Sequence, residues 1–226
     1  QFHWWDYAVP GLVEAVGHLA ELRRRGKIRH LGGTNFDAPH TRDMLDAGVP
    51  LVSMQVQYSP LDRRVAGALS GVCAEYGLRF LCYGTIAGGF LSNRWLGQPV
   101  PAEPLANRSL VKYRLIIEEF GGWDAFQALL RLLDGIGRKH GVSISAVATR
   151  WVLEQPHVAG AIVGARYAEH LADNLIVFRF MLDARDHAAI NALLADHPGP
   201  GGDFYALERD RTGPHGRIMK YELNRA

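Results

Sequence analysis

The chain is poor in cysteine, with Cys73 and Cys82 as its two thiols among 226 residues. Neither cysteine belongs to a Cys-x-x-Cys pair or to a Cys/His spacing that is typical of a metal site. So few cysteines exclude a disulfide scaffold. The apolar residues around both positions predict two buried, unpaired thiols, and we expect no metal site.

Long apolar runs and an excess of charge are also missing. No apolar run approaches the ~18 residues that a membrane-spanning helix needs, and no signal peptide is recognisable. The net charge is +2 and the basic residues are scattered, which argues against nucleic acid or a membrane as a partner. We therefore expect a cytoplasmic protein with the ordinary composition of a globular domain.

An initiating methionine is absent as well. Gln1 stands directly inside a segment that reads as a strand. The length of 226 residues is also short of the about 250 residues that a complete α/β barrel needs. We therefore expect the chain to be part of a longer protein.

Most of the chain repeats one order of elements: an apolar run, a polar or glycine-rich turn and an amphipathic helix. This pattern predicts strands at residues 1–5, 27–31, 51–55, 78–82 and 158–163. It predicts helices at residues 12–25, 39–47, 65–76, 108–119, 123–139, 145–154, 169–178 and 184–195. Apolar strands that alternate with helices predict an α/β fold with a parallel sheet.

Residues 1–197 read as one partial barrel and residues 198–226 as a C-terminal tail. About five βα units are visible, whereas eight close a (β/α)8 TIM barrel, so we expect an incomplete one. The tail is rich in glycine and charge and shows no periodicity. It either folds over the mouth of the barrel or is mobile, and the sequence does not decide between the two.

Polar side chains stand where the predicted strands end. His3, Asn35, Gln55 and Tyr83 each occupy such a position. Because the carboxyl ends of parallel strands meet at one edge of a sheet, we expect these groups to share a site there. A Gly-x-Gly-x-x-Gly fingerprint does not occur, which disfavours a Rossmann fold.

Five segments, in order and over nearly the whole chain, together resemble the aldo-keto reductase family from its fourth to its eighth strand. They are Phe2-His3-Trp4-Trp5-Asp6, the stretch 26–36 around Gly33-Thr34-Asn35-Phe36, Met54-Gln55-Val56-Gln57-Tyr58-Ser59-Pro60-Leu61, Tyr83-Gly84-Thr85-Ile86-Ala87-Gly88-Gly89-Phe90-Leu91, and Val163-Gly164-Ala165-Arg166 with Glu169, His170, Asp173 and Asn174. The resemblance implies an NADP-dependent oxidoreductase that transfers hydride between a nicotinamide cofactor and a small carbonyl substrate.

The resemblance makes His3 a catalytic residue, which orients the substrate carbonyl and stabilises its developing negative charge. A core histidine satisfied by the backbone is the structural alternative. Side chains alternate along a strand, so Trp5 lies on the same face as His3 and is assigned to the substrate pocket, whereas Trp4 packs against a helix.

The family pattern also assigns the cofactor-binding residues. Thr34, Asn35 and Gln55 supply the donors and acceptors for the nicotinamide carboxamide, and Tyr83 stacks on the nicotinamide ring. The remaining cofactor residues fall in two segments. Those for the pyrophosphate are Gly84, Thr85, Ala87, Gly88 and Leu91. Those for the adenosine phosphate are Gly164, Arg166, His170, Asp173 and Asn174. His170 departs from the usual Arg or Gln, so NADP(H) is expected and NAD(H) is the alternative.

The proton donor of the family is a tyrosine whose pKa a lysine and an aspartate tune, and no position here matches their motifs. We therefore expect the chain as given to lack turnover. A non-catalytic nucleotide-binding module on the same fold is the second hypothesis. A hydrolase with paired carboxylates fits less well, because the strand ends carry His, Asn, Gln and Tyr. The substrate and the oligomeric state are not predicted.

Overall fold

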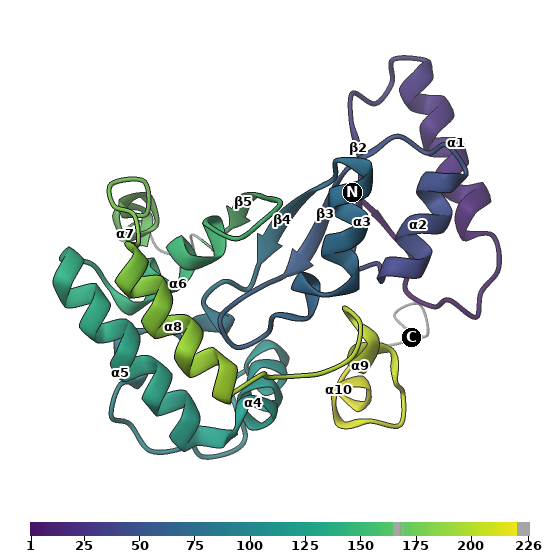
Figure 1. The fold of residues 1–226 in the computed structure, drawn as a ribbon. Helices are drawn as coiled ribbons and strands as arrows, with labels where there is room; N and C mark the ends of the chain where they lie inside the picture. Colours follow the sequence, from purple (N-terminus) through teal and green to yellow (C-terminus); the bar gives the residue numbers. More distant parts are fainter. Residues whose placement is uncertain (165–167, 169, 221–226) are drawn as a thin grey trace.

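Five parallel strands form one sheet in the computed structural model, which describes residues 1–164, 168 and 170–220. Their spatial order follows the chain: β1 (Phe2–His3), β2 (Leu31–Thr34), β3 (Leu51–Gln57), β4 (Arg79–Tyr83) and β5 (Val158–Ile162). Every neighbouring pair is parallel, and β1 and β5 stand at the two edges of the sheet (Figure 1). The predicted α/β fold with a parallel sheet is confirmed.

Helices follow the strands as the repeat predicts. Their bounds are α1 (Leu12–Arg24), α2 (Ala38–Asp46), α3 (Ala68–Tyr76), α4 (Arg108–Phe120), α5 (Gly122–His140), α6 (Ile144–Leu153), α7 (His170–Ile176), α8 (Ala184–Asp196), α9 (Ala206–Arg209) and α10 (Pro214–Arg217), with short 3-10 turns η1 (Arg64–Ala66), η2 (Ala87–Gly89) and η3 (Asn93–Trp95). Helices α1 to α3 lie beside the β1–β3 end of the sheet, and α5 to α8 lie beyond β4 and β5 (Figure 1).

The second strand lies further along the chain than its apolar residues predict. Residues 27–31 were the expected strand, whereas β2 runs from Leu31 to Thr34. Gly32 and Gly33 are therefore inside the strand. A Cβ on Gly32 would lie 2.4 Å from Ser53 Oγ, and a Cβ on Gly33 would lie 2.7 Å from the Met54 side chain. The glycines let β2 approach β3 closely, which a pattern of apolar residues does not reveal.

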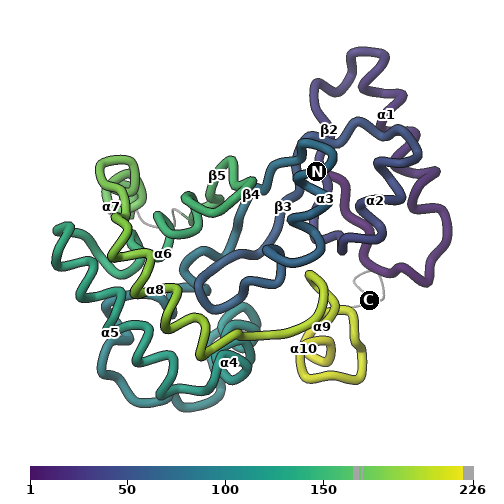
Figure 2. The backbone as a smooth tube through the Cα atoms, viewed as in Figure 1, coloured from purple at the N-terminus to yellow at the C-terminus, as the bar shows by residue number. Residues whose placement is uncertain are grey.

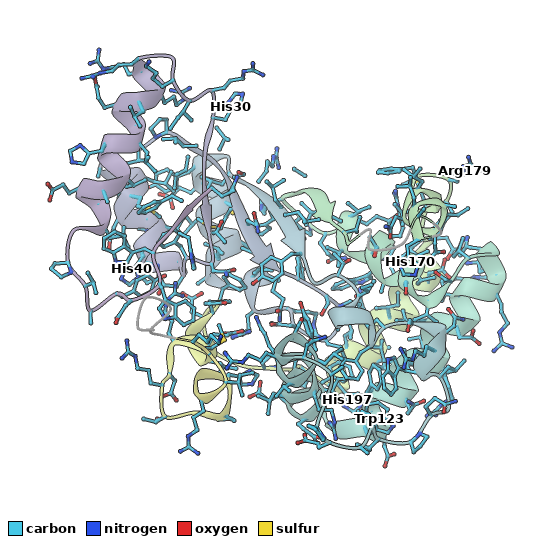
Figure 3. The ribbon with its side chains drawn as sticks, turned by 180° about the vertical axis from the view of Figure 1, so that it is seen from behind. His30, His40, Trp123, His170, Arg179 and His197 are labelled. Carbon is cyan, nitrogen blue, oxygen red and sulfur yellow. The ribbon has the colours of Figure 1, made fainter. Side chains whose placement is uncertain are left out.

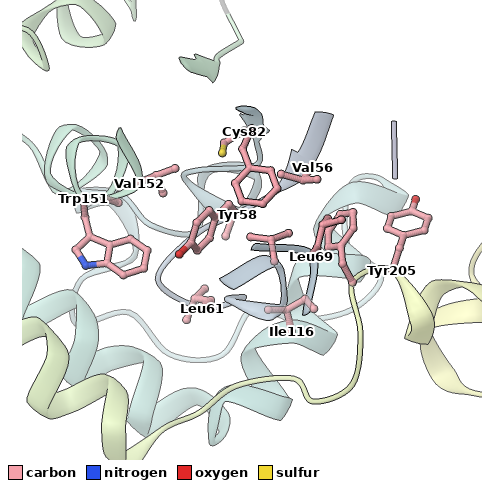
Figure 4. Close-up of a cluster of buried hydrophobic side chains, with 14 of the residues drawn as sticks. Val56, Tyr58, Leu61, Leu69, Cys82, Ile116, Trp151, Val152 and Tyr205 are labelled. Carbon is pink, nitrogen blue, oxygen red and sulfur yellow. The ribbon is translucent and has the colours of Figure 1, made fainter. Parts of the chain in front are cut away.

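The core lies between the sheet and the helices that cover it. Tyr58 packs edge-on against Trp151 with ring centroids 5.7 Å apart, and Cys82 of β4 belongs to the same buried cluster (Figure 4). Cys73 and Cys82 are both buried and free, so the prediction for the two thiols is confirmed. None of the helices that the model describes is long and apolar enough to cross a membrane. Among the same residues, no group of acidic, histidine or cysteine side chains could hold a metal ion.

Residues 198–220 pack on the rest of the molecule and contain α9 and α10. The chain leaves α8 and crosses the carboxyl ends of the strands to reach these two short helices (Figure 2). Asp203 Oδ2 accepts a hydrogen bond of 3.0 Å from the backbone N–H of Ala38, and His215 Nε2 lies 3.0 Å from Glu119 Oε1. The division of the chain after residue 197 stays a prediction, but the described part of the tail is folded.

Candidate active site at the carboxyl ends of the strands

A cavity of about 860 Å³ opens where β1 to β4 end. It brings together six residues that the sequence assigns to the site, and helix α4 and the tail complete its wall. Gln55 lies two residues before the end of β3, because that strand extends to Gln57 and not to residue 55 as expected. The lining residues are His3, Trp5, Thr34, Asn35, Gln55, Tyr83, Arg108, Ser109, Lys112, Tyr113, Tyr205, Ile218, Met219 and Lys220. A concave site of this size with a few convergent polar groups is typical of small-molecule binding.

Asn35 is the most constrained of the polar groups. It is 7% exposed and has a left-handed backbone with φ of 58°. Its N–H donates to Gln55 O at 3.1 Å, and Tyr83 Oη donates to its side-chain Oδ1 at 2.9 Å. These bonds join the ends of β2, β3 and β4, and they hold a non-glycine residue in a conformation that is costly elsewhere.

His3 lies at the rim of the cavity on the same face as Trp5, with ring centroids 6.2 Å apart. Partial desolvation lowers the pKa of His3, and the positive charge of Arg209 lowers it further. Both effects disfavour the imidazolium and favour the neutral imidazole. Trp4 points away from the cavity: it packs on the Phe2 ring at 6.0 Å, and its Nε1 donates to Val9 O at 3.2 Å.

A second cavity of about 430 Å³ lies next to the first, across the wall formed by Ser109 and Tyr113, which line both. The loop after β4 reaches it through Gly84, Thr85 and Gly88. Gly84 has φ of 69°, and a Cβ there would stand 2.2 Å from Tyr113 Oη. Glycine is therefore required for both the backbone conformation and the close approach of α4.

The other two residues that the sequence assigns to this loop are buried. Ala87 and Leu91 belong to the hydrophobic core and line neither of the two cavities. They therefore support the shape of the loop, and the structure does not place them on the wall of either cavity.

The opposite wall of the second cavity comes from the segment after β5 and from α7, through Gly164, His170, Asp173 and Asn174. Asn174 Nδ2 donates to Gly164 O at 3.2 Å, and Ser143 Oγ donates to Asp173 at 2.9 Å. His170 is exposed on α7, on the far side of the sheet from His40 of α2 (Figure 3). Arg166 lies outside the described residues.

Sequence reasoning missed Lys112, which projects from α4 into the first cavity. Its Nζ lies 5.0 Å from the centroid of the Tyr205 ring and 5.9 Å from that of Tyr83. Burial lowers the pKa of Lys112, and the nearby carboxylate of Glu208, at 3.4 Å, opposes that shift. Its spacing of four residues from buried Ile116 places it on the apolar face of the helix, which is the sequence feature that could have revealed it.

A buried ion cluster attaches the tail beside this cavity. Arg64 donates to Glu208 through both Nη atoms at 2.9 Å and to Asp62 through Nε at 3.0 Å and Nη2 at 2.8 Å. Burial alone would raise the pKa of Glu208, but the hydrogen bonds from Arg64 and the charges of Lys112 and Arg64 lower it to about 2. The tail therefore carries an ionised carboxylate into the interior.

Comparison with known proteins places the chain in one family. The family model for aldo/keto reductases matches residues 1–195. The chain belongs to the aldo/keto reductase family. It is 27% identical to an NADH-specific methylglyoxal reductase from Escherichia coli over 175 residues, which are 77% of this chain and 51% of that protein. It is 33% identical to flagellar radial spoke protein 5 from Chlamydomonas reinhardtii, over 68% of the chain and 33% of that protein.

A solved structure resembles this aldo/keto reductase chain closely. The glycerol dehydrogenase of Gluconobacter oxydans superposes with a TM-score of 0.74 at 25% identity, over 88% of this chain and 59% of that one. The chain thus spans between about a third and three fifths of the length of these relatives. The expected family is confirmed.

Proposed function

We propose that the chain forms the nicotinamide-cofactor site and one side of the substrate pocket of an NADP-dependent oxidoreductase that acts on an aldehyde or ketone. The observation that carries the proposal is the convergence of Thr34, Asn35, Gln55 and Tyr83 on one cavity. In a longer protein that includes this chain we expect a closed (β/α)8 barrel, because β1 and β5, at the two edges of the sheet, each pair with one strand among the described residues. A cytoplasmic location stays a prediction from the sequence.

The residues present fit a nicotinamide dinucleotide. Gln55 offers an amide with both a donor and an acceptor at the cavity wall, which a carboxamide requires. Tyr83 provides an aromatic ring whose hydroxyl is held by Asn35. The adjoining cavity, with Gly84 and Gly88 at positive φ, gives an extended ligand room for its phosphates near backbone N–H groups. When bound, the reduced cofactor supplies the hydride.

The side chains near the ring would act on the carbonyl substrate. His3, as a neutral imidazole, can donate a hydrogen bond to the carbonyl oxygen and stabilise the negative charge that develops there. Trp5 and Tyr205 meet edge to face at 5.9 Å and form an aromatic wall on the same side. The protonation of the product requires a donor that none of the sequence motifs supplies, so we propose that this chain binds the cofactor without efficient turnover.

The second candidate function is a non-catalytic nucleotide-binding module. It is favoured by the same observation, because the cofactor residues gather in the cavity while the motifs of the proton donor are unmatched. Measurement of turnover in the longer protein separates the two candidates: an enzyme consumes NADPH with an aldehyde substrate, and a module binds it without consumption.

The choice between NADP(H) and NAD(H) rests on the α7 side of the second cavity. We propose NADP(H), with Arg166 as the partner of the 2′-phosphate, since a guanidinium suits a phosphate. The bacterial methylglyoxal reductase is NADH-specific by name, so the preference varies within the family and needs its own measurement.

Calorimetric titration of the chain with NADPH and with NADH tests the proposal. NADPH should bind more tightly than NADH. Asn35→Ala should weaken NADPH binding about tenfold, because it removes an amide of the carboxamide site and a hydrogen bond to Tyr83. The matched control is Asn191→Ala on the exposed side of α8, which should leave the affinity unchanged. Equal affinities for the wild type and Asn35→Ala would contradict the proposed site.

A further inference from the structure

Arg209, the last residue of α9, binds the backbone at the ends of two strands. Its Nη2 donates to Asn35 O at 2.8 Å and to Trp4 O at 3.3 Å, and its Nε donates to Trp5 O at 3.3 Å. One side chain from the tail therefore connects the segment after β1 with the segment after β2. His3 is the last residue of β1 and Thr34 the last residue of β2, so these segments carry Trp5 and Asn35 directly beyond them.

Aromatic rings surround the guanidinium. Its Cζ lies 3.9 Å from the centroid of the Tyr7 ring and 5.2 Å from that of Tyr205. Such stacking fixes the plane of the group and directs its N–H donors at the carbonyls, which the round ammonium of a lysine cannot reproduce.

The position of Arg209 is also set by its neighbour in the sequence. Glu208 is anchored in the buried cluster with Arg64, so α9 cannot shift without breaking that ion pair. Tyr205, at the start of α9, packs edge-on against Trp5. The position of the guanidinium is thus set from the tail by the buried pair of Glu208 with Arg64. Its N–H groups bind the backbone carbonyls at the strand ends.

We propose that Arg209 is a positioning residue of the active site, which holds the end of β1 with His3 and Trp5 at a fixed distance from Asn35 at the end of β2. It touches neither of the proposed ligands and acts through the residues it binds. The inference rests on the proposed function in one respect, namely that His3 and Asn35 serve the same reaction.

Arg209 also acts on His3 through its charge. The imidazole faces the cavity, where the other charged groups among the described lining residues are Arg108, Lys112 and Lys220, and the titratable phenols are Tyr83, Tyr113 and Tyr205. No carboxylate of a described residue lines this cavity, although Glu208, outside the lining, pairs with Lys112 at 3.4 Å. Loss of the Arg209 charge should raise the pKa of His3, while desolvation, the larger cause, keeps it below the ordinary value.

The test follows the His3 ring by NMR across pH in the wild type, Arg209→Met and Arg209→Lys, with His3→Gln used to assign the signal. Arg209→Met should raise the pKa of His3 and shift the Asn35 amide resonance. Arg209→Lys keeps the charge, so the pKa of His3 should stay near the wild-type value, but the Asn35 resonance should still move because the planar donors are lost. NADPH affinity should fall about tenfold in Arg209→Met.

Arg179→Met is the matched control, since Arg179 is exposed and lies on the opposite side of the molecule from the yellow helix α9, which carries Arg209 (Figure 3). It should change neither resonance. The same His3 titration in Arg209→Met as in the wild type, with an unmoved Asn35 amide, would overturn the proposal. If the wild type does not bind NADPH while the His3 and Asn35 signals respond as expected, the proposed function fails and the positioning role stands.

Discussion

Loss of the Glu208 charge should destabilise the protein far more than loss of an exposed carboxylate. Glu208 and Arg64 are each 1% exposed in their side chains, and Asp62 is fully buried. With Lys112 they form two cations and two carboxylates that balance one another. Glu208→Gln preserves the shape of the side chain but leaves one buried cation without a counter-charge.

The size of the effect follows from that imbalance. Removal of one partner of a buried ion pair costs ~3–5 kcal/mol. Asp62 keeps a bidentate contact with Arg64 in the variant, so the lower end, ~3 kcal/mol, is expected here. In a chain of this size each kcal/mol moves Tm by ~2–4 °C, which gives a fall of ~6–12 °C.

Urea unfolding followed by tryptophan fluorescence measures the free energy of unfolding directly. The matched control is Glu75→Gln, which breaks the exposed pair with Arg42 and should leave the free energy of unfolding nearly unchanged. The reasoning is refuted if Glu208→Gln costs no more than this control, because the buried cluster would then contribute nothing to the attachment of the tail.

The free energies of unfolding of the wild type and Glu208→Gln should also depend differently on pH. The pKa of Glu208 is lowered to about 2 in the folded state, so its ionised form contributes stability above the unfolded-state pKa near 4.5. That contribution is lost as the pH falls from about 4.5 toward 2. The difference in free energy of unfolding between the wild type and Glu208→Gln should therefore be full at pH 6 and shrink through this range.

Two further substitutions test the loop after β4. Gly84→Ala should destabilise the protein by more than ~1 kcal/mol in urea unfolding, because Gly84 has a positive φ and a Cβ there would contact Tyr113 Oη. The control is Gly71→Ala, in open space on α3, which should be neutral or stabilising. Equal effects of the two would contradict the close approach of α4. Thr85→Val should cost ~1–3 kcal/mol by the same measurement, since the buried hydroxyl of Thr149 loses the Thr85 hydroxyl that lies 3.1 Å from it. An unchanged unfolding midpoint would show that this hydrogen bond is not formed.

The sequence predicted the sheet and the strand-end residues because both depend on local pattern. Alternation of apolar strands and amphipathic helices determines a parallel sheet, and a parallel sheet places all strand ends on one side. The pattern alone therefore predicts that Gln55 and Tyr83 lie close together, as they do in the cavity. The shift of β2 could not be foreseen, because the close contact between Gly33 and Met54 is tertiary.

The contribution of the tail could not be predicted for a different reason. Residues 198–220 form helices of four residues each, which have no detectable periodicity, and their attachment depends on pairing with residues more than a hundred positions away. Charged Glu208 and Arg64 read as surface residues in the sequence, and only the fold brings them together in the interior. A sequence pattern that treats every charged residue as exposed cannot predict a buried network of charges.

The central claim is that the residues at the carboxyl ends of the parallel strands form one nicotinamide site. Its most direct test is the nuclear Overhauser contact between the nicotinamide protons of bound NADPH and the ring protons of Tyr83, measured on the wild-type chain. We expect contacts to the Tyr83 ring, together with perturbed side-chain amides of Asn35 and Gln55. NADPH that binds with no contact to Tyr83, and with both amides unmoved, would contradict it.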